Sequence, residues 1–264
     1  MARTKNGNNL KLAGLFVVIV LGLIVISALF KFLLILEASK FDGSHSFIVS
    51  FVGKGNIQVA SFSPQDRTLS ILDVDSKYNY NDLSKSLEIP VDGTITLQDS
   101  NTNNISSMLL KSTFSLGHSL KNLTALDAFR LLLFYKTISQ NNIYVRKLSS
   151  DLNDAQKATI INLSFTDPSI YQENQAIQII NASDVRGLGS RLAALITNIG
   201  GNVVLVSTSD QVIQSSKIVY FGKESYTVKK MGDYLGISPE SSSQKGVADV
   251  IITIGKDKAG SFNF

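Results

Sequence analysis

The segment Ala176–Ser207 reads AIQIINASDVRGLGSRLAALITNIGGNVVLVS and carries strand, helix and strand signals in turn. Ala176–Ile180 is rich in isoleucine and predicts a strand. Gly187–Ile199 predicts a helix because its leucines recur along one face, and a pair of glycines follows where glycine commonly ends a helix. Val203–Ser207 is apolar again and predicts a second strand. The segment therefore predicts a βαβ unit.

Three further elements continue this unit toward the C-terminus. They are a strand at Lys217–Phe221, a helix at Thr227–Leu235 that Gly236 closes, and a strand at Val250–Ile254. The order βαββαβ is typical of a ferredoxin-like fold, in which two helices cover one face of a four-stranded sheet. Because Val203–Val206 and Val250–Ile254 are almost entirely apolar, we expect both strands to be buried in the sheet.

Strand and helix signals also alternate in the section before this unit. The runs Ser46–Val52, Ile57–Ser63 and Thr68–Val74 are rich in β-branched and aromatic residues and are separated by turn residues, which predicts an antiparallel meander. Thr124–Ile138 predicts a helix, and Thr124 with an aspartate three residues later fits a capping box. An α+β domain is the expectation here as well.

An uncharged, almost wholly apolar run, Leu12–Phe30, lies near the N-terminus. At about 1.5 Å per residue, a helix over this run nearly matches the roughly 30 Å hydrocarbon core of a bilayer. Arg3, Lys5 and Lys11 precede it without an acidic residue, which predicts a cytoplasmic N-terminus. Two alternatives are a cleaved signal peptide and a buried core helix. Glu37–Lys40 is a poor cleavage site, so we expect a membrane anchor.

The fold class that follows is α+β, with one membrane helix and two extracytoplasmic domains. The predicted organisation is a cytoplasmic stub at 1–11, a transmembrane helix at 12–36, an α+β domain at 45–165, a βαββαβ domain at 174–257 and a tail at 258–264.

Composition excludes several classes of function. The chain has no cysteine, so disulfides and thiol chemistry are absent. The net charge is +4 and no block of basic residues occurs, which disfavours nucleic acid as a partner. Only His45 and His118 could supply imidazole ligands, so carboxylates would have to supply most ligands of a zinc site; no clustered set stands out, and no metal site is predicted. No cofactor is predicted either.

The C-terminal segment resembles a known domain along its whole length. Ile177–Ser183, followed by Gly187 at the start of a helix, is similar to the "V-x-V-x-N-G-[ST]…G-L-A" opening of the C-terminal domain of LytR–CpsA–Psr envelope proteins. Lys217–Gly222 and Gly246–Asp257 resemble its "I-x-Y" strand and its closing "A-D-V-x-V-x-[IL]-G-x-D". Ala182 departs from the usual glycine. The resemblance implies a protein of the cell envelope.

The first extracytoplasmic domain is faintly similar to the catalytic domain of the same family. Ser61–Asp73 resembles its "v-S-x-x-P-x-t-k-x-v-x-l-l-s" hairpin, and Leu87–Gly93 its "L-G-I-P-V-D-G-Y" stretch. The family continues with "I-P-R-D-t", where this chain has Leu72–Ser76. In the family, arginines and aspartates hold a lipid-linked pyrophosphate and its metal ion. Without those arginines, Asp73 and Asp75 would repel a pyrophosphate, which implies a relative without the transferase chemistry.

The turn between the first strand and the first helix of the C-terminal domain is the candidate ligand site. Its residues are Asn181, Ser183, Arg186 and Gly187. A helix N-terminus offers free amides to an anion or a sugar hydroxyl, and Arg186 could add a charge-assisted bond. The alternative is that Asn181, Ser183 and Asp184 only cap and shape the turn. No catalytic residue is predicted, since strand-end solvation explains Asp73 and Asp75.

The sequence predicts a non-catalytic, membrane-anchored envelope protein that binds cell-wall polymer or wall-assembly proteins. Tethering would raise the effective concentration of a weak binder at the wall. Two alternatives stay open: a phosphotransferase that attaches glycopolymers to the wall, and a scaffold subunit that contacts proteins alone. The oligomeric state stays open too.

Overall fold

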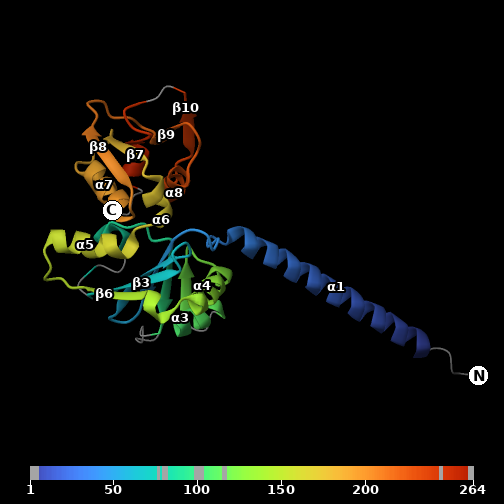
Figure 1. The fold of residues 1–264 in the computed structure, drawn as a ribbon. Helices are drawn as coiled ribbons and strands as arrows, with labels where there is room; N and C mark the ends of the chain where they lie inside the picture. The colour runs from blue at the N-terminus through green and yellow to red at the C-terminus, as the bar shows by residue number, and fades with distance from the viewer. Residues whose placement is uncertain are drawn as a thin grey trace, which may run out of the picture. The chain divides into compact units, whose positions relative to one another are not determined.

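The computed structural model describes residues 6–75, 78, 83–97, 104–114, 118–243 and 246–260. The chain divides into two compact units, Met1–Lys40 and Phe41–Phe264 (Figure 1). The first unit contains helix α1 (Asn6–Ala38), in which Leu12–Ala38 is long and apolar enough to cross a membrane. Its most apolar stretch has no share buried inside the protein, so it is not the core helix of a folded domain.

A six-stranded sheet forms the first half of the second unit. Its strand order is β5-β4-β1-β2-β3-β6. The bounds are β1 Phe47–Val52, β2 Ile57–Ser63, β3 Thr68–Val74, β4 Gly93–Leu97, β5 His118–Lys121 and β6 Ile143–Leu148. Strands β1, β2 and β3 pair antiparallel, which confirms the predicted meander, and β4 and β6 join it in parallel to β1 and β3.

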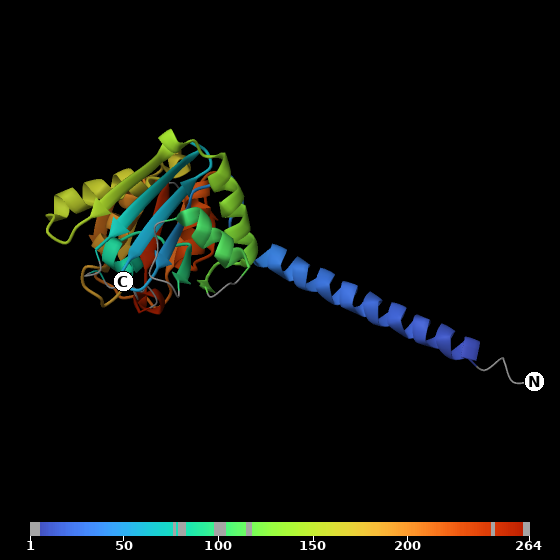
Figure 2. The ribbon, with the colours of Figure 1, turned by 90° about the horizontal axis from the view of Figure 1, so that it is seen from below.

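Helices cover both faces of this sheet. Helices α3 (Ile105–Thr113) and α4 (Ala125–Thr137) pack on one face, against a core that includes Phe51, Phe62 and Leu131 (Figure 2). Thr124 and Asp127 form the predicted capping box at the start of α4. The short helix α2 (Leu83–Leu87) and helix α5 (Asp154–Phe165) contribute to the core on the other face.

A second sheet, of five strands, carries the C-terminal part of the chain. Its order is β10-β9-β11-β7-β8. The elements are β7 Ala176–Asn181, α7 Leu188–Asn198, β8 Asn202–Thr208, β9 Lys217–Phe221, α8 Tyr226–Leu235, β10 Pro239–Ser242, β11 Val250–Ile254 and the short α9 Lys256–Ala259. The α+β class is therefore confirmed.

The strand arrangement is not ferredoxin-like. In a ferredoxin-like sheet another strand separates the two strands of each βαβ unit. Here β8 lies directly beside β7 and parallel to it, and β10 lies parallel to β9, so α7 and α8 each connect neighbouring parallel strands. The polar strand β10 (PESS) has no strand-like sequence signal. The predicted order of elements does not reveal which strands pair.

The prediction that Val203–Val206 is a buried strand was wrong. Strand β8 is at the edge of the sheet, where Val204, Leu205 and Val206 are 51%, 43% and 41% exposed. An apolar run can form an edge strand as well as a central one, because the burial of a strand depends on its place in the sheet. The same reasoning was right for β11, which lies between β9 and β7 with Val250, Ile252 and Ile254 fully buried.

One hydrophobic core connects the two sheets. It contains Leu72 and Leu148 from the first sheet, Phe165 from α5, and residues of β7, β11, α7 and α8 from the second. Helix α6 (Pro168–Glu173) follows α5 and occupies the interval between the predicted domains at 45–165 and 174–257. Pro168 stands in the first turn of this helix, a position that tolerates proline.

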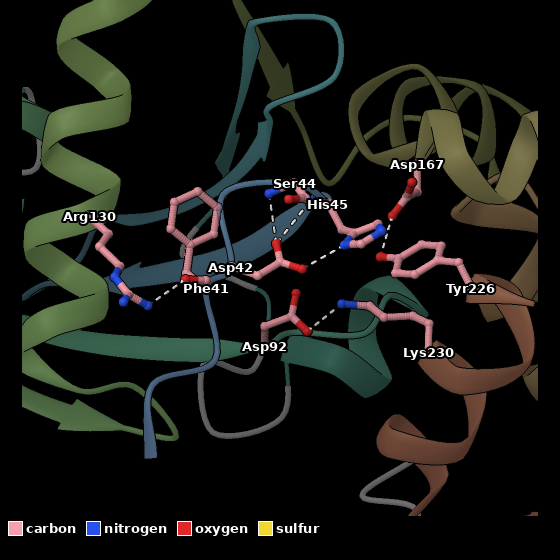
Figure 3. A network of polar contacts seen from close by, with 9 residues as sticks. All are labelled: Phe41, Asp42, Ser44, His45, Asp92, Arg130, Asp167, Tyr226 and Lys230. Atoms are coloured by element: carbon pink, nitrogen blue, oxygen red, sulfur yellow. Dashed lines mark hydrogen bonds and ion pairs between the residues drawn. The ribbon is translucent and has the colours of Figure 1, made fainter. Parts of the chain in front are cut away.

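Polar contacts join the start of the second unit to helices α6 and α8 (Figure 3). Asp42 accepts hydrogen bonds from the backbone of Ser44 (2.7 Å) and from Nδ1 of His45 (2.6 Å). The His45 ring stacks on Tyr226, with 4.0 Å between centroids and 10° between planes. The Tyr226 hydroxyl donates to Asp167, 2.9 Å away. His45 thus lies in a packed junction.

An ion pair closes the same junction. Lys230 of α8 lies 2.7 Å from Asp92 (Figure 3). The second oxygen of Asp92 accepts the backbone N–H of Ile48 at 2.8 Å. Burial, followed by the negative charge of Asp167 and its hydrogen bond, raises the pKa of Tyr226. Its hydroxyl therefore stays protonated and keeps donating to Asp167 at any physiological pH.

Candidate functional site

The turn predicted as a ligand site is held by its own side chains. Asn181 is buried; its amide donates to the carbonyl of Val185 (2.9 Å), and its oxygen accepts from the N–H (3.1 Å) and hydroxyl (2.7 Å) of Ser183. The Ser183 hydroxyl in turn accepts the N–H of Val185 at 3.2 Å. These bonds give Asn181 and Ser183 a turn-shaping role.

The exposed part of the same turn is Asp184–Gly187. Gly187 precedes α7 with φ +80°, a conformation that glycine adopts at little cost, and Lys256 lies 3.7 Å from Asp184. Arg186 is the one of the four predicted site residues with an exposed, charged side chain. The structure brings Asn181 and Ser183 together but leaves Arg186 separate from them, on the surface.

The aspartates near the end of β3 accept hydrogen bonds from polar side chains of neighbouring segments. Asp73 accepts a hydrogen bond of 2.6 Å from the Gln58 amide, and Asp75 accepts one of 3.2 Å from Ser150. Arg67, the arginine that the sequence offers nearby, lies in the β2–β3 turn at the opposite end of β3.

A cleft of about 380 Å³ lies between the β2–β3–β6 part of the first sheet and helices α5 and α6. Four of its hydroxyl groups face one another across two strands: Ser61 pairs with Ser70, and Ser63 with Thr68. The other lining residues are Asp66, Tyr144, Arg146, Leu163, Ser164, Thr166, Pro168, Tyr171 and Gln172.

Two polar atoms that belong to this cleft have no hydrogen-bond partner among the described residues. They are Oγ of Ser63 and Nη1 of Arg146, and both atoms are buried. The guanidinium of Arg146 lies over the ring of Tyr144, 5.6 Å from its centroid. A buried donor without a partner is costly, which marks this cleft as a candidate binding site.

This cleft is not among the sites predicted from the sequence, although a signal for it is present. Serine and threonine occupy every second position at Ser61 and Ser63 on β2 and at Thr68 and Ser70 on β3. In a covered sheet those positions should be apolar on the inward face. Arg146 and helices α5 and α6 come from sections without a clear periodic pattern, so their approach to these strands could not be foreseen.

Comparison with known proteins identifies the C-terminal part. The family model described as "LytR cell envelope-related transcriptional attenuator" matches residues 174–257. No curated protein matches the chain in sequence.

Solved structures give weaker likenesses. TagT of Bacillus subtilis is 15% identical, with 75% of this chain and 95% of TagT covered and a TM-score of 0.19. The B. subtilis protein ywtF is 14% identical over 76% of this chain and 94% of its own, with a TM-score of 0.19. Lin1025 of Listeria innocua is 11% identical over 83% and 97%, with a TM-score of 0.20. Scores this low do not establish a common fold.

The family match covers the segment whose motifs at Ile177–Ser183 and Gly246–Asp257 resemble the same domain. Residues 174–257 of this chain are a LytR C-terminal domain.

Proposed function

We propose that this protein is a non-catalytic cell-envelope protein, anchored in the cell membrane by α1, that binds cell-wall polymer outside the cytoplasm. The observation that carries the proposal is the presence, in one chain, of an envelope-type LytR C-terminal domain and an N-terminal helix fit to cross a membrane. The bias of basic residues before α1 supports a cytoplasmic N-terminus and an exported second unit.

The surroundings of Asp73 support a binding role over a transferase role. Transfer of a pyrophosphate-linked polymer needs cations that neutralise the phosphates. Asp73 is bonded to Gln58, and Arg67 lies at the far end of β3. Arg146 of β6 pairs with Leu72, so it is on the opposite face of the sheet from Asp73. In the surface turn, Arg186 is available for a negatively charged or hydroxyl-bearing polymer. Tethering at the membrane surface makes a modest affinity at such a turn sufficient.

Co-sedimentation with isolated cell-wall sacculi tests this function. The full chain, purified in detergent micelles, should be retained by sacculi at low and at moderate salt. Arg186→Gln should reduce retention about threefold to tenfold, the range expected from losing one charge-assisted hydrogen bond. Lys223→Gln is the matched control, because it removes one positive charge from another exposed loop.

Absence of retention of the wild-type chain at both salts would contradict polymer binding. It would favour the scaffold alternative, with a protein partner. The full chain is the right material because the LytR C-terminal domain shares its hydrophobic core with the first sheet.

A further inference from the structure

The inward face of strands β2, β3 and β6 changes character along its length. Toward one end it carries Val59, Leu72 and Leu148, which belong to the shared hydrophobic core. Toward the β2–β3 turn the same face carries hydroxyl groups, and Arg146 lies beside Leu72 where the apolar and polar ends meet. There the cover of α5 and α6 leaves the cleft of about 380 Å³. Packing alone would favour apolar residues along the whole face, so the polar end needs another explanation.

We propose that this cleft binds an anionic saccharide unit. The proposal rests on the proposed function, because it names the ligand class and a binding site for the wall polymer. The cleft is distinct from the surface turn at Arg186 and from Asp73, which stands at the other end of β3 from the β2–β3 turn.

The anionic part of the ligand follows from Arg146. Its Nη1 is buried without a hydrogen-bond acceptor among the described residues, which is especially unfavourable for a charged group. A carboxylate or phosphate oxygen in the cleft would supply the acceptor and the opposite charge together. Arginine suits such groups because its planar fork can donate two parallel hydrogen bonds.

The saccharide part follows from the paired hydroxyl groups. Ser61 with Ser70, and Ser63 with Thr68, place four hydroxyls in a grid with roughly 5 Å between strands and about 7 Å along them. A hydroxyl both donates and accepts, as a sugar hydroxyl does. Ser63 is only 6% exposed and its oxygen has no partner in the described part of the chain. Asp66 adds an acceptor for a sugar hydroxyl.

Two aromatic rings complete the fit to a sugar. Tyr144 and Tyr171 line the cleft from opposite sides, from β6 and α6, and are 44% and 67% exposed. An exposed tyrosine offers an apolar ring face and a polar tip, which suits a ligand with both apolar C–H faces and hydroxyls. An inorganic anion would use the arginine but neither the hydroxyl grid nor the rings.

Ligand-detected NMR with the full chain in micelles tests this assignment. The probes are glucuronic acid, glucose 1-phosphate, glucose and inorganic phosphate. We expect both charged sugars, or one of them, to bind at least tenfold more tightly than glucose and than phosphate. Binding of one charged sugar alone identifies the anion as carboxylate or phosphate. Equal binding of phosphate and glucose 1-phosphate would overturn the saccharide assignment.

Two substitutions test the residues. Arg146→Gln should weaken binding of the charged sugar about tenfold or more, and Ser63→Ala about threefold. Because the Ser63 hydroxyl has no partner, Ser63→Ala should leave the thermal midpoint unchanged or slightly raised. Ser46→Ala is the matched control: Ser46 is also 6% exposed with an unpartnered hydroxyl, but it lies outside the cleft lining.

The outcomes separate this inference from the proposed function. If Arg146→Gln and Ser63→Ala bind the charged sugars with wild-type affinity, the assignment of the sugar site to this cleft is wrong. Retention by sacculi through Arg186 could still hold in that case. Weaker binding in these two variants by the stated factors, with Ser46→Ala and Arg186→Gln unaffected, would establish the cleft as the sugar site.

Discussion

Replacement of Asp127 by alanine is expected to lower the free energy of unfolding by about 3–5 kcal/mol. The Asp127 side chain is fully buried at the start of α4. One of its oxygens accepts the backbone N–H of Phe41 at 2.9 Å, and the other accepts the N–H (2.8 Å) and the hydroxyl (2.7 Å) of Thr124. Alanine would leave the buried N–H of Phe41 and the half-buried donors of Thr124 without this acceptor, at roughly 1–3 kcal/mol for a buried donor.

The measurement is thermal unfolding of the full chain followed by circular dichroism, where this loss corresponds to a drop of roughly 10 °C. Asp154→Ala is the matched control, because Asp154 is also in the first turn of a helix but its side chain is fully exposed. We expect it to change stability by less than about 0.5 kcal/mol. Equal effects of the two substitutions would contradict the role assigned to Asp127.

Replacement of Phe165 by alanine should also lower the free energy of unfolding by about 3–5 kcal/mol. Phe165 is fully buried at the end of α5, in the core that both sheets share. Removing the ring leaves a cavity between elements that come from both halves of the second unit. Because that core is continuous, we expect the second unit to unfold in one cooperative transition and the variant to shift all of it.

Denaturant unfolding checks this expectation, followed by near-ultraviolet and by far-ultraviolet circular dichroism. The unfolding transitions measured by the two probes should coincide. Phe114→Ala provides the control, since Phe114 is 66% exposed and outside either core. Two separated transitions, with only one of them moved by Phe165→Ala, would show instead that the two halves are independent domains, as the sequence boundary near 165–174 predicts.

Local signals in the sequence predicted local structure well. The meander β1–β3 was predicted from alternating β-branched and aromatic runs, and its turns lie where the glycine-rich and proline-containing segments stand. The capping box of Thr124 and Asp127 was predicted from two residue types at the right spacing. Both succeed because hydrogen bonds within a few residues decide the outcome.

Long-range pairing escaped prediction. The choice of β8 as the neighbour of β7, and the addition of β10, depend on how α7 and α8 cross the sheet, which no local pattern contains. The same limit applies to the cleft. Ser63 and Arg146 come from strands far apart in sequence, and α6 is too short a helix to show an apolar period. The turn at Asn181 was located from sequence, but its internal hydrogen bonds were not.

Binding of cell-wall polymer requires the second unit to lie outside the cytoplasm. Site-directed labelling tests this location most directly. The chain has no cysteine, so a single introduced thiol is free of background. Ser215→Cys places it at an exposed position of the LytR C-terminal domain, and Thr4→Cys places it in the predicted cytoplasmic stub. In intact cells, a membrane-impermeant maleimide should label Ser215→Cys and should label Thr4→Cys only after lysis. The reverse pattern would place the folded unit in the cytoplasm and contradict wall binding.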